Sequence, residues 1–347
     1  MAAILTTPRA CDRPLAEAYD TALLDLDGVV YAGSQAVPHA VAALRAAREG
    51  GMRLAFVTNN ALRTPAAVAA HLTGLGVPAA ESSVITSAQA VARLVAERVP
   101  AGAPVLCAGG EGLRVALAEH GLRPVDSADD DPAAVVQGYG GPDMRWATLA
   151  EAALAVGRGV PWFASNTDAT VPSGRGLAPG NGAAVEVVRV ATGHAGPEVA
   201  GKPAPPMHRE AMLRSQARRP LIVGDRLDTD IAGAHHGGVD ALLVLTGVTG
   251  AAELLAAPPA HRPAYVAADL RGLLAPQPAV VREPSGGGFA CGGWRAGVSG
   301  GALRCERTAP GGDPADGLRA LCAAAWTHAG EGRCTLPAHE ALAALER

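Results

Sequence analysis

The sequence predicts an α/β fold in which helices wind on both faces of a parallel sheet. Short apolar runs recur along the chain, and a segment of helical pattern follows most of them. Two of these runs, at 21–30 and 52–60, end abruptly in polar residues, as buried parallel strands do at a ligand-binding edge. Hydrophobic residues make up 49% of the chain and charged residues 18%, which is typical of a well-buried globular protein.

Two strand–helix pairs open the predicted core. The run TALLDLDGVV at 21–30 predicts a strand, and a helix is expected at 38–48 with a proline in its first turn. The run MRLAFVTNN at 52–60 predicts the second strand. Thr64 and Pro65 then begin a helix as its N-cap and its first helical residue.

The same alternation continues to about residue 274, interrupted by a Gly/Pro-rich loop at 171–182. Further strands are expected at 104–110, 133–139, 160–166, 220–225 and 240–248. Further helices are expected at 111–120, 145–156, 183–191, 207–215 and from 229, with a last α/β element at 264–274.

The residues after 274 differ in composition from the rest of the chain. The stretch at 275–288 is rich in Pro and Gly and predicts a linker, and a hairpin around 297–305 precedes a helix at 314–328. The length of 347 residues also favours more than one domain. The predicted organisation is a core at 15–87 and 198–276, an inserted α/β domain at 88–197, a linker at 277–287 and a small C-terminal α+β domain at 288–347.

Composition excludes several classes of protein. A formal charge of −4 without a basic stripe argues against a nucleic-acid partner. No stretch reaches the roughly 18 apolar residues of a membrane span, and the first residues lack the apolar region of a signal peptide. The six cysteines form no C-x-x-C pair, so they are expected to be reduced thiols. These features predict a cytoplasmic enzyme.

Polar residues at the ends of three predicted strands are expected at one edge of the sheet, where open α/β proteins bind ligands. They are Asp25 and Asp27, the run Thr58, Asn59 and Asn60, and Asp225, with Lys202 in a loop that leads into a helix. In extended chain, residues two apart point the same way, so Asp25 and Asp27 would repel each other unless a cation lies between them. Carboxylates at strand ends suit Mg²⁺, which binds a few carboxylates, waters and a substrate phosphate.

Lys202 is the only lysine of the chain, since the other 28 of the 29 basic residues are arginines. An ammonium is a compact point charge, whereas a guanidinium is a broad planar fork. A site that grips one small anion in a tight space would distinguish the two, although chance could also leave a single lysine here.

These residues carry a family resemblance. The sequence resembles the four motifs of the haloacid dehalogenase-like (HAD) phosphatases in Asp25-Leu-Asp27-Gly28-Val, Thr58, Lys202, and Gly224-Asp225 with Asp228 and Asp230. The stretch FASNTDATVPSGRGLAPGNGA at 163–183 resembles the nitrophenylphosphatase-like branch. The resemblance covers some three-quarters of the chain and implies a Rossmann-like HAD core with an inserted C2-type cap.

The resemblance also implies roles for the acidic residues. Asp25 would be the nucleophile that forms an aspartyl-phosphate, and Asp27 would protonate the leaving alkoxide and then activate water. Mg²⁺ would be held by Asp25, the backbone carbonyl of Asp27 and Asp225. Gly28, Asp228 and Asp230 would support this arrangement.

Other residues are expected to contact the substrate. Thr58 would hold a phosphoryl oxygen near the backbone amides of Asn59 and Asn60. Lys202 would neutralise the transferring phosphoryl group and Asp25. Asn166 and Asp168 are turn formers that would reach the substrate rim if the cap closes, as in relatives.

The resemblance therefore predicts a Mg²⁺-dependent phosphomonoesterase acting on a small phosphorylated metabolite. The position of the C-terminal domain resembles bacterial glycerol-3-phosphate phosphatases that carry an acetyltransferase-like segment, which favours glycerol 3-phosphate as substrate. That domain lacks an R/Q-x-x-G-x-G/A loop, so a packing or assembly module is expected, and the oligomeric state is left open.

Alternative substrates are phosphoglycolate, a nucleoside monophosphate and pyridoxal phosphate. A phosphomutase ranks lower because the inserted domain has an α/β pattern, whereas helical caps are more usual in phosphomutases. A binding protein that has lost activity ranks last because every catalytic position is intact.

Overall fold

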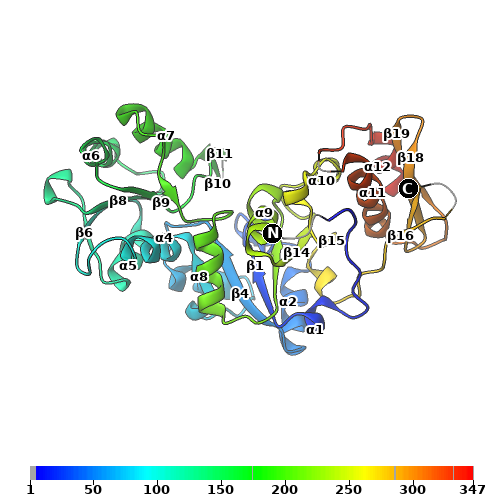
Figure 1. The fold of residues 1–347 in the computed structure, drawn as a ribbon. Helices are drawn as coiled ribbons and strands as arrows, with labels where there is room; N and C mark the ends of the chain where they lie inside the picture. The colour runs from blue at the N-terminus through cyan, green and yellow to red at the C-terminus, as the bar shows by residue number, and fades with distance from the viewer. Residues whose placement is uncertain (1–4, 174, 285–286, 331, 347) are drawn as a thin grey trace. The chain divides into compact units, whose positions relative to one another are not determined.

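The computed structural model describes residues 5–173, 175–284, 287–330 and 332–346. The chain divides into two compact units, one of Met1–Leu54 with Ala217–Arg347 and one of Ala55–Gln216. Parallel sheets flanked by helices form both units, which confirms the predicted α/β class (Figure 1). No helix in the described part of the chain is long and apolar enough to cross a membrane.

The first unit contains four parallel strands in the order β15-β14-β13-β1. These strands are β1 (Thr21–Leu24), β13 (Pro220–Gly224), β14 (Asp240–Val244) and β15 (Tyr265–Ala267). Its helices are α1 (Leu15–Ala18), α2 (Ala40–Glu49), the π-helix Leu227–Ile231, α9 (Ala232–Gly237) and α10 (Ala251–Leu255). All four residues of β1 are buried, as the apolar run predicts for a strand inside a parallel sheet.

The first strand ends earlier than the sequence predicts. The run at 21–30 stops being extended at Leu24, and the carbonyl oxygen of Leu26 accepts hydrogen bonds from the backbone amides of Val30 and Tyr31 at 2.9 and 3.1 Å. Gly28 lies at φ +81°, a conformation that L side chains rarely adopt. A tight turn therefore follows the strand and leads into the short hairpin β2 (Tyr31–Ala32) and β3 (Gln35–Ala36).

The C-terminal residues form a four-stranded antiparallel sheet with two helices (orange to red in Figure 1). Its elements are β16 (Val281–Arg282), β17 (Phe289–Cys291), β18 (Trp294–Ser299), β19 (Ala302–Arg307), α11 (Pro314–Ala329) and α12 (His339–Leu345). The expected hairpin and the expected long helix are confirmed. The expected linker contains a strand, because β16 pairs with β17.

This C-terminal part shares a hydrophobic core with the strands that precede it. Val266 of β15 and Trp326 of α11 belong to one cluster of buried side chains. The indole Nε1 of Trp326 donates to the carbonyl oxygen of Leu254 at 3.1 Å, and the guanidinium of Arg319 donates to that of Val266 at 2.6 Å. The domain boundaries given above stay predictions. All six cysteines are free thiols, as predicted.

The second unit contains a parallel sheet in the order β12-β9-β8-β6-β7. Its strands are β6 (Pro104–Ala108), β7 (Arg123–Val125), β8 (Ala134–Gln137), β9 (Trp162–Ala164) and β12 (Glu198–Val199), with a hairpin of β10 (Thr170–Ser173) and β11 (Gly176–Pro179). β4 (Arg53–Thr58) ends in this unit and pairs in parallel with β5 (Val84–Thr86). Its helices are α3 (Pro65–Gly74), α4 (Ser87–Ala96), α5 (Glu111–Glu119), α6 (Trp146–Gly157), α7 (Asn181–Thr192) and α8 (Pro205–Ser215).

The start of α3 bears out the capping pattern read from the sequence. The hydroxyl oxygen of Thr64 accepts a hydrogen bond from the amide of Ala67 at 3.2 Å, and Pro65 is the first helical residue. The helix expected from 229 is instead a π-helix over Leu227–Ile231 that continues into α9. Single π-helical turns of this kind are frequent at functional sites.

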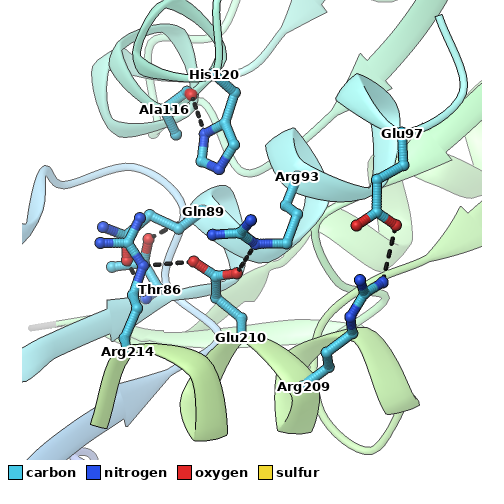
Figure 2. A network of polar contacts seen from close by, with 9 residues as sticks. All are labelled: Thr86, Gln89, Arg93, Glu97, Ala116, His120, Arg209, Glu210 and Arg214. Carbon is cyan, nitrogen blue, oxygen red and sulfur yellow. Dashed lines mark hydrogen bonds and ion pairs between the residues drawn. The ribbon is translucent and has the colours of Figure 1, made fainter. Parts of the chain in front are cut away.

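A buried carboxylate fixes α8, the helix that begins shortly after Lys202. The side chain of Glu210 is fully buried between the guanidinium groups of Arg93 on α4 and Arg214 on α8 (Figure 2). A second ion pair also joins these two helices: the guanidinium of Arg209 on α8 pairs with the carboxylate of Glu97, at the end of α4, at 2.8 Å. Burial alone would raise the pKa of Glu210, but the two guanidinium groups outweigh it and hold the pKa below its ordinary value.

Glu210→Gln is expected to lower the free energy of unfolding at neutral pH by about 3 kcal/mol, because it leaves two guanidinium groups beside a neutral amide. A lowered pKa in the folded protein means that the carboxylate stabilises the fold above the ordinary value of 4.5 and loses this effect as the pH falls through the lowered pKa. The difference between Glu210→Gln and the parent should therefore shrink in acid. Urea unfolding followed by circular dichroism at several pH values measures it.

Glu97→Gln is the matched control, because the Glu97–Arg209 pair is well exposed and should contribute less than about 1 kcal/mol. An equal cost for the two variants, or a cost of Glu210→Gln that does not depend on pH, would contradict this account of the buried pair.

Candidate active site

Three carboxylates converge in the first unit. One oxygen each of Asp25, Asp225 and Asp230 lies within 4.8 Å of the other two. Asp25 directly follows β1, Asp225 directly follows β13, and Asp230 belongs to the π-helix after it. Asp225 and Asp230 are each only 1% exposed. Negative charges this close and this buried destabilise one another unless a cation compensates them.

Glycines make room for this cluster. A Cβ atom on Gly247 would lie 1.9 Å from Oδ2 of Asp225, and one on Gly28 would lie 2.6 Å from the same oxygen. A Cβ atom on Gly224 would lie 2.2 Å from the Cβ of Asp230. The backbone therefore approaches both buried carboxylates more closely than any other residue type would allow.

Backbone amides orient the two buried carboxylates. The amide of Val248 donates to Oδ2 of Asp225 at 2.7 Å, and the amide of Arg226 donates to Oδ2 of Asp230 at 3.2 Å. The amide of Asp25 donates to the carbonyl oxygen of Val223 at 2.8 Å, which ties the end of β1 to β13. A set of hard oxygen atoms fixed in this way fits a divalent cation such as Mg²⁺ or Ca²⁺.

Asp27 and Asp228 lie outside this group of three carboxylates. Asp27 is exposed in the turn after β1, so the alternation of an extended strand does not place its carboxylate beside that of Asp25. Its expected part in metal binding is through its backbone carbonyl. Asp228 pairs with the guanidinium of Arg226 at 2.8 Å. Asp230, expected only as a supporting residue, is the third member of the cluster.

The second unit holds the remaining predicted residues. Thr58, at the end of β4, is buried, and its Oγ1 accepts a hydrogen bond from the amide of Asn60 at 3.0 Å. Its hydroxyl keeps a hydrogen of its own to donate. The amide of Asn60 was expected to contact phosphate, and here it donates to Thr58. The side-chain oxygen of Asn60 accepts from the amides of Leu62 and Arg63 and fixes the turn.

Lys202 lies at the centre of a polar network in this unit. Its ammonium Nζ donates to the carbonyl oxygen of Val57 on β4 at 3.1 Å. The side chain of Asn59 bonds to the backbone of Lys202, and the carboxylate of Asp168 accepts from Asn59 Nδ2 at 3.2 Å. Asn166 is buried, and its Nδ2 donates to the carbonyl oxygen of Asn59 at 2.8 Å. The structure therefore brings these four predicted residues together, with Asn166 committed to the protein backbone.

Comparison with known proteins identifies the fold. The model of the haloacid dehalogenase-like hydrolases matches residues 22–123, a HAD-hydrolase-like model matches 199–273, and a GCN5-related N-acetyltransferase-like domain model matches 291–347. D-Glycerol 3-phosphate phosphatase of Mycobacterium tuberculosis is 46% identical over 84% of this chain and 79% of its own length.

Two solved structures extend this similarity. A glycerol phosphate phosphatase from Mycobacterium tuberculosis in complex with magnesium matches 96% of this chain and 98% of its own with a TM-score of 0.84 at 43% identity. A p-nitrophenyl phosphatase from Archaeoglobus fulgidus matches 74% of this chain and 98% of its own with a TM-score of 0.67 at 29% identity.

The chain therefore belongs to the haloacid dehalogenase-like hydrolases. Within that family it is a phosphatase, a phosphoric monoester hydrolase. The resemblance read from its motifs is confirmed, including the nitrophenylphosphatase-like similarity and the acetyltransferase-like C-terminal domain.

Gly247→Ala is expected to weaken Mg²⁺ binding by about 10-fold or more. The added methyl group must push away either the carboxylate of Asp225 or the backbone at residue 247, which disturbs the arrangement of the carboxylates. Thermal unfolding at increasing Mg²⁺ concentration measures this, since an ion that binds the folded state raises Tm. Gly250→Ala is the matched control in the same loop, because a Cβ there would meet no atom of the described residues within 4 Å. An equal response of both variants to Mg²⁺ would contradict the packing argument.

Proposed function

We propose that this chain is a Mg²⁺-dependent phosphomonoesterase that hydrolyses glycerol 3-phosphate through an aspartyl-phosphate. The observation that carries the proposal is the convergence of Asp25, Asp225 and Asp230 at the ends of parallel strands. The carboxylate of Asp25 can attack phosphorus, and the two buried carboxylates of Asp225 and Asp230 are suited to binding a cation that compensates their charge.

The metal would be held by the carboxylates of Asp25 and Asp225 and by the backbone carbonyl of Asp27, with Asp230 beside them. When bound, the ion would neutralise the phosphoryl oxygens and hold them for attack. The amide of Val248 fixes the orientation of Asp225 at 2.7 Å, so this ligand is already aimed before any ion binds.

The chemistry would proceed in two displacement steps. The carboxylate of Asp25 attacks phosphorus while the bond to the substrate oxygen breaks, and Asp27 gives its proton to the departing alkoxide. Asp27 then takes a proton from water, which attacks the phosphorus of the aspartyl-phosphate and releases inorganic phosphate and the carboxylate of Asp25. An exposed position suits Asp27, because the acid must exchange its proton with leaving group and water.

Thr58 and Lys202 would bind the phosphoryl group. The hydroxyl oxygen of Thr58 accepts a hydrogen bond from the backbone amide of Asn60. The hydroxyl hydrogen therefore points in another direction and can be donated to a phosphoryl oxygen. The ammonium of Lys202 would neutralise charge that develops on the transferring group.

The choice of glycerol 3-phosphate rests on similarity along the whole chain. The glycerol phosphate phosphatase from Mycobacterium tuberculosis matches 96% of this chain, whereas the p-nitrophenyl phosphatase from Archaeoglobus fulgidus matches 74% of it. The formal charge of −4 favours a small metabolite over nucleic acid, and six free thiols support a cytoplasmic location.

Phosphate release tests the proposal directly. Glycerol 3-phosphate should give the highest kcat/KM among glycerol 3-phosphate, phosphoglycolate, a nucleoside monophosphate and pyridoxal phosphate. Chelation with EDTA should abolish the activity and Mg²⁺ should restore it. Asp25→Asn should lose several powers of ten in kcat, whereas Asp12→Asn, an exposed aspartate of the same unit, should behave as the parent. Turnover that survives EDTA or Asp25→Asn would refute the mechanism.

Lys202→Arg is expected to cost about as much as Lys202→Ala, roughly two to three powers of ten in kcat, with little change in Tm. The reason is shape: the ammonium lies 3.1 Å from the carbonyl oxygen of Val57, and a planar guanidinium with five donors cannot take the same position. Steady-state kinetics of the two variants measure this. If Lys202→Arg kept more than about a third of the parent turnover, positive charge alone would be sufficient.

A further inference from the structure

The side chain of Asn59 forms hydrogen bonds to both the backbone amide and the backbone carbonyl of Lys202. Its Oδ1 accepts from the amide of Lys202 at 2.8 Å, and its Nδ2 donates to the carbonyl oxygen of Lys202 at 3.2 Å. Such paired contacts imitate the hydrogen bonds between neighbouring strands. They join two residues that lie 143 positions apart in the sequence.

The partners of this carboxamide leave it only one orientation. An amide nitrogen on Lys202 requires an acceptor, while the Lys202 carbonyl and the carboxylate of Asp168 both require donors. Rotation of the Asn59 side chain by half a turn would oppose every one of these contacts. Asp168 therefore favours the same orientation of the Asn59 side chain as the backbone of Lys202 does.

Neighbouring groups hold Asn59 itself in place. Its carbonyl oxygen accepts from Oγ of Ser87 at 2.6 Å and from Nδ2 of Asn166 at 2.8 Å, which uses both lone pairs. Gly201 lets the two segments close, because a Cβ there would lie 2.7 Å from Oδ1 of Asn59. The residue before Lys202 must therefore lack a side chain.

We propose that Asn59 is a positioning residue for Lys202 and that Asp168 acts through Asn59. This assignment differs from the substrate contact that the sequence suggested for both residues. The effect of Asn59 on catalysis rests on the proposed function, whereas the ordering of the Lys202 backbone by Asn59 does not.

The energetic reason lies in the length of the lysine side chain. Four flexible methylene torsions separate the backbone of Lys202 from its ammonium, and ordering such a chain costs about 2 kcal/mol. The carboxamide of Asn59 fixes one end, and the carbonyl oxygen of Val57 accepts from the other at 3.1 Å. The ammonium is therefore held in place before substrate arrives, which is the condition for electrostatic catalysis.

The single lysine of the chain provides a direct structural test. Protein labelled only with ¹⁵N-lysine should show one backbone amide signal, that of Lys202. Asn59→Ala should speed hydrogen exchange of this amide by about 10-fold or more, because its acceptor is lost. Asp168→Ala should change it in the same direction by less. Asn60→Ala, the same change one residue along, should leave the exchange rate within about threefold. Unchanged exchange in Asn59→Ala would overturn the assignment.

Kinetics test whether this contact serves catalysis. Asn59→Ala should lower kcat by about 10- to 100-fold in the parent but by less than about threefold in the Lys202→Ala background, because its effect passes through Lys202. Equal losses in the two backgrounds would show that Asn59 acts on the substrate instead, which overturns the proposal. Absence of phosphatase activity in the parent would instead refute the proposed function, and the exchange measurement would still decide the structural assignment.

Discussion

The enforced proximity of Asp25, Asp225 and Asp230 is the constraint on which the first unit depends. Two buried carboxylates and a partly buried one whose oxygens lie within 4.8 Å of one another are unfavourable unless a cation compensates their charge. Strand ends supply two of these residues, and a π-helix brings the third back to the same place. Glycines around Asp225 remove the side chains that would otherwise hold the backbone away. Under the proposed function, this local structure serves to bind a metal.

The second unit holds one positive charge, the ammonium of Lys202, in a fixed position. Lys202 is fixed through its backbone by Asn59 and through its ammonium by Val57, while the loop that carries it leads into α8. The buried Glu210 anchors that helix to α4 through the guanidinium of Arg93, while Arg214 of α8 pairs with the same carboxylate. Rigid support of this kind converts a flexible lysine into a fixed electrostatic group.

Short patterns were sufficient to predict the α/β class and the family, and they also selected candidate site residues whose roles stay predictions. The pattern at 25–28 directly follows β1, the pattern at 224–230 runs from the last residue of β13 into the π-helix, and the isolated lysine shortly precedes α8. The place of Asp230 in the carboxylate cluster was not predicted, because the pattern indicated an ordinary helix from 229 where the structure has a π-helix over Leu227–Ile231. The contact of Asn59 with the backbone of Lys202 was not predicted, because a contact between a side chain and a distant backbone depends on tertiary structure alone.

Calorimetric titration with Mg²⁺ tests the central claim, that the carboxylate cluster is a metal site. The account predicts one ion per chain, with affinity lowered about 10- to 100-fold or more in Asp225→Asn and changed less than about threefold in Asp228→Asn, which alters a carboxylate outside the cluster. Equal affinity of the parent and Asp225→Asn would contradict the account.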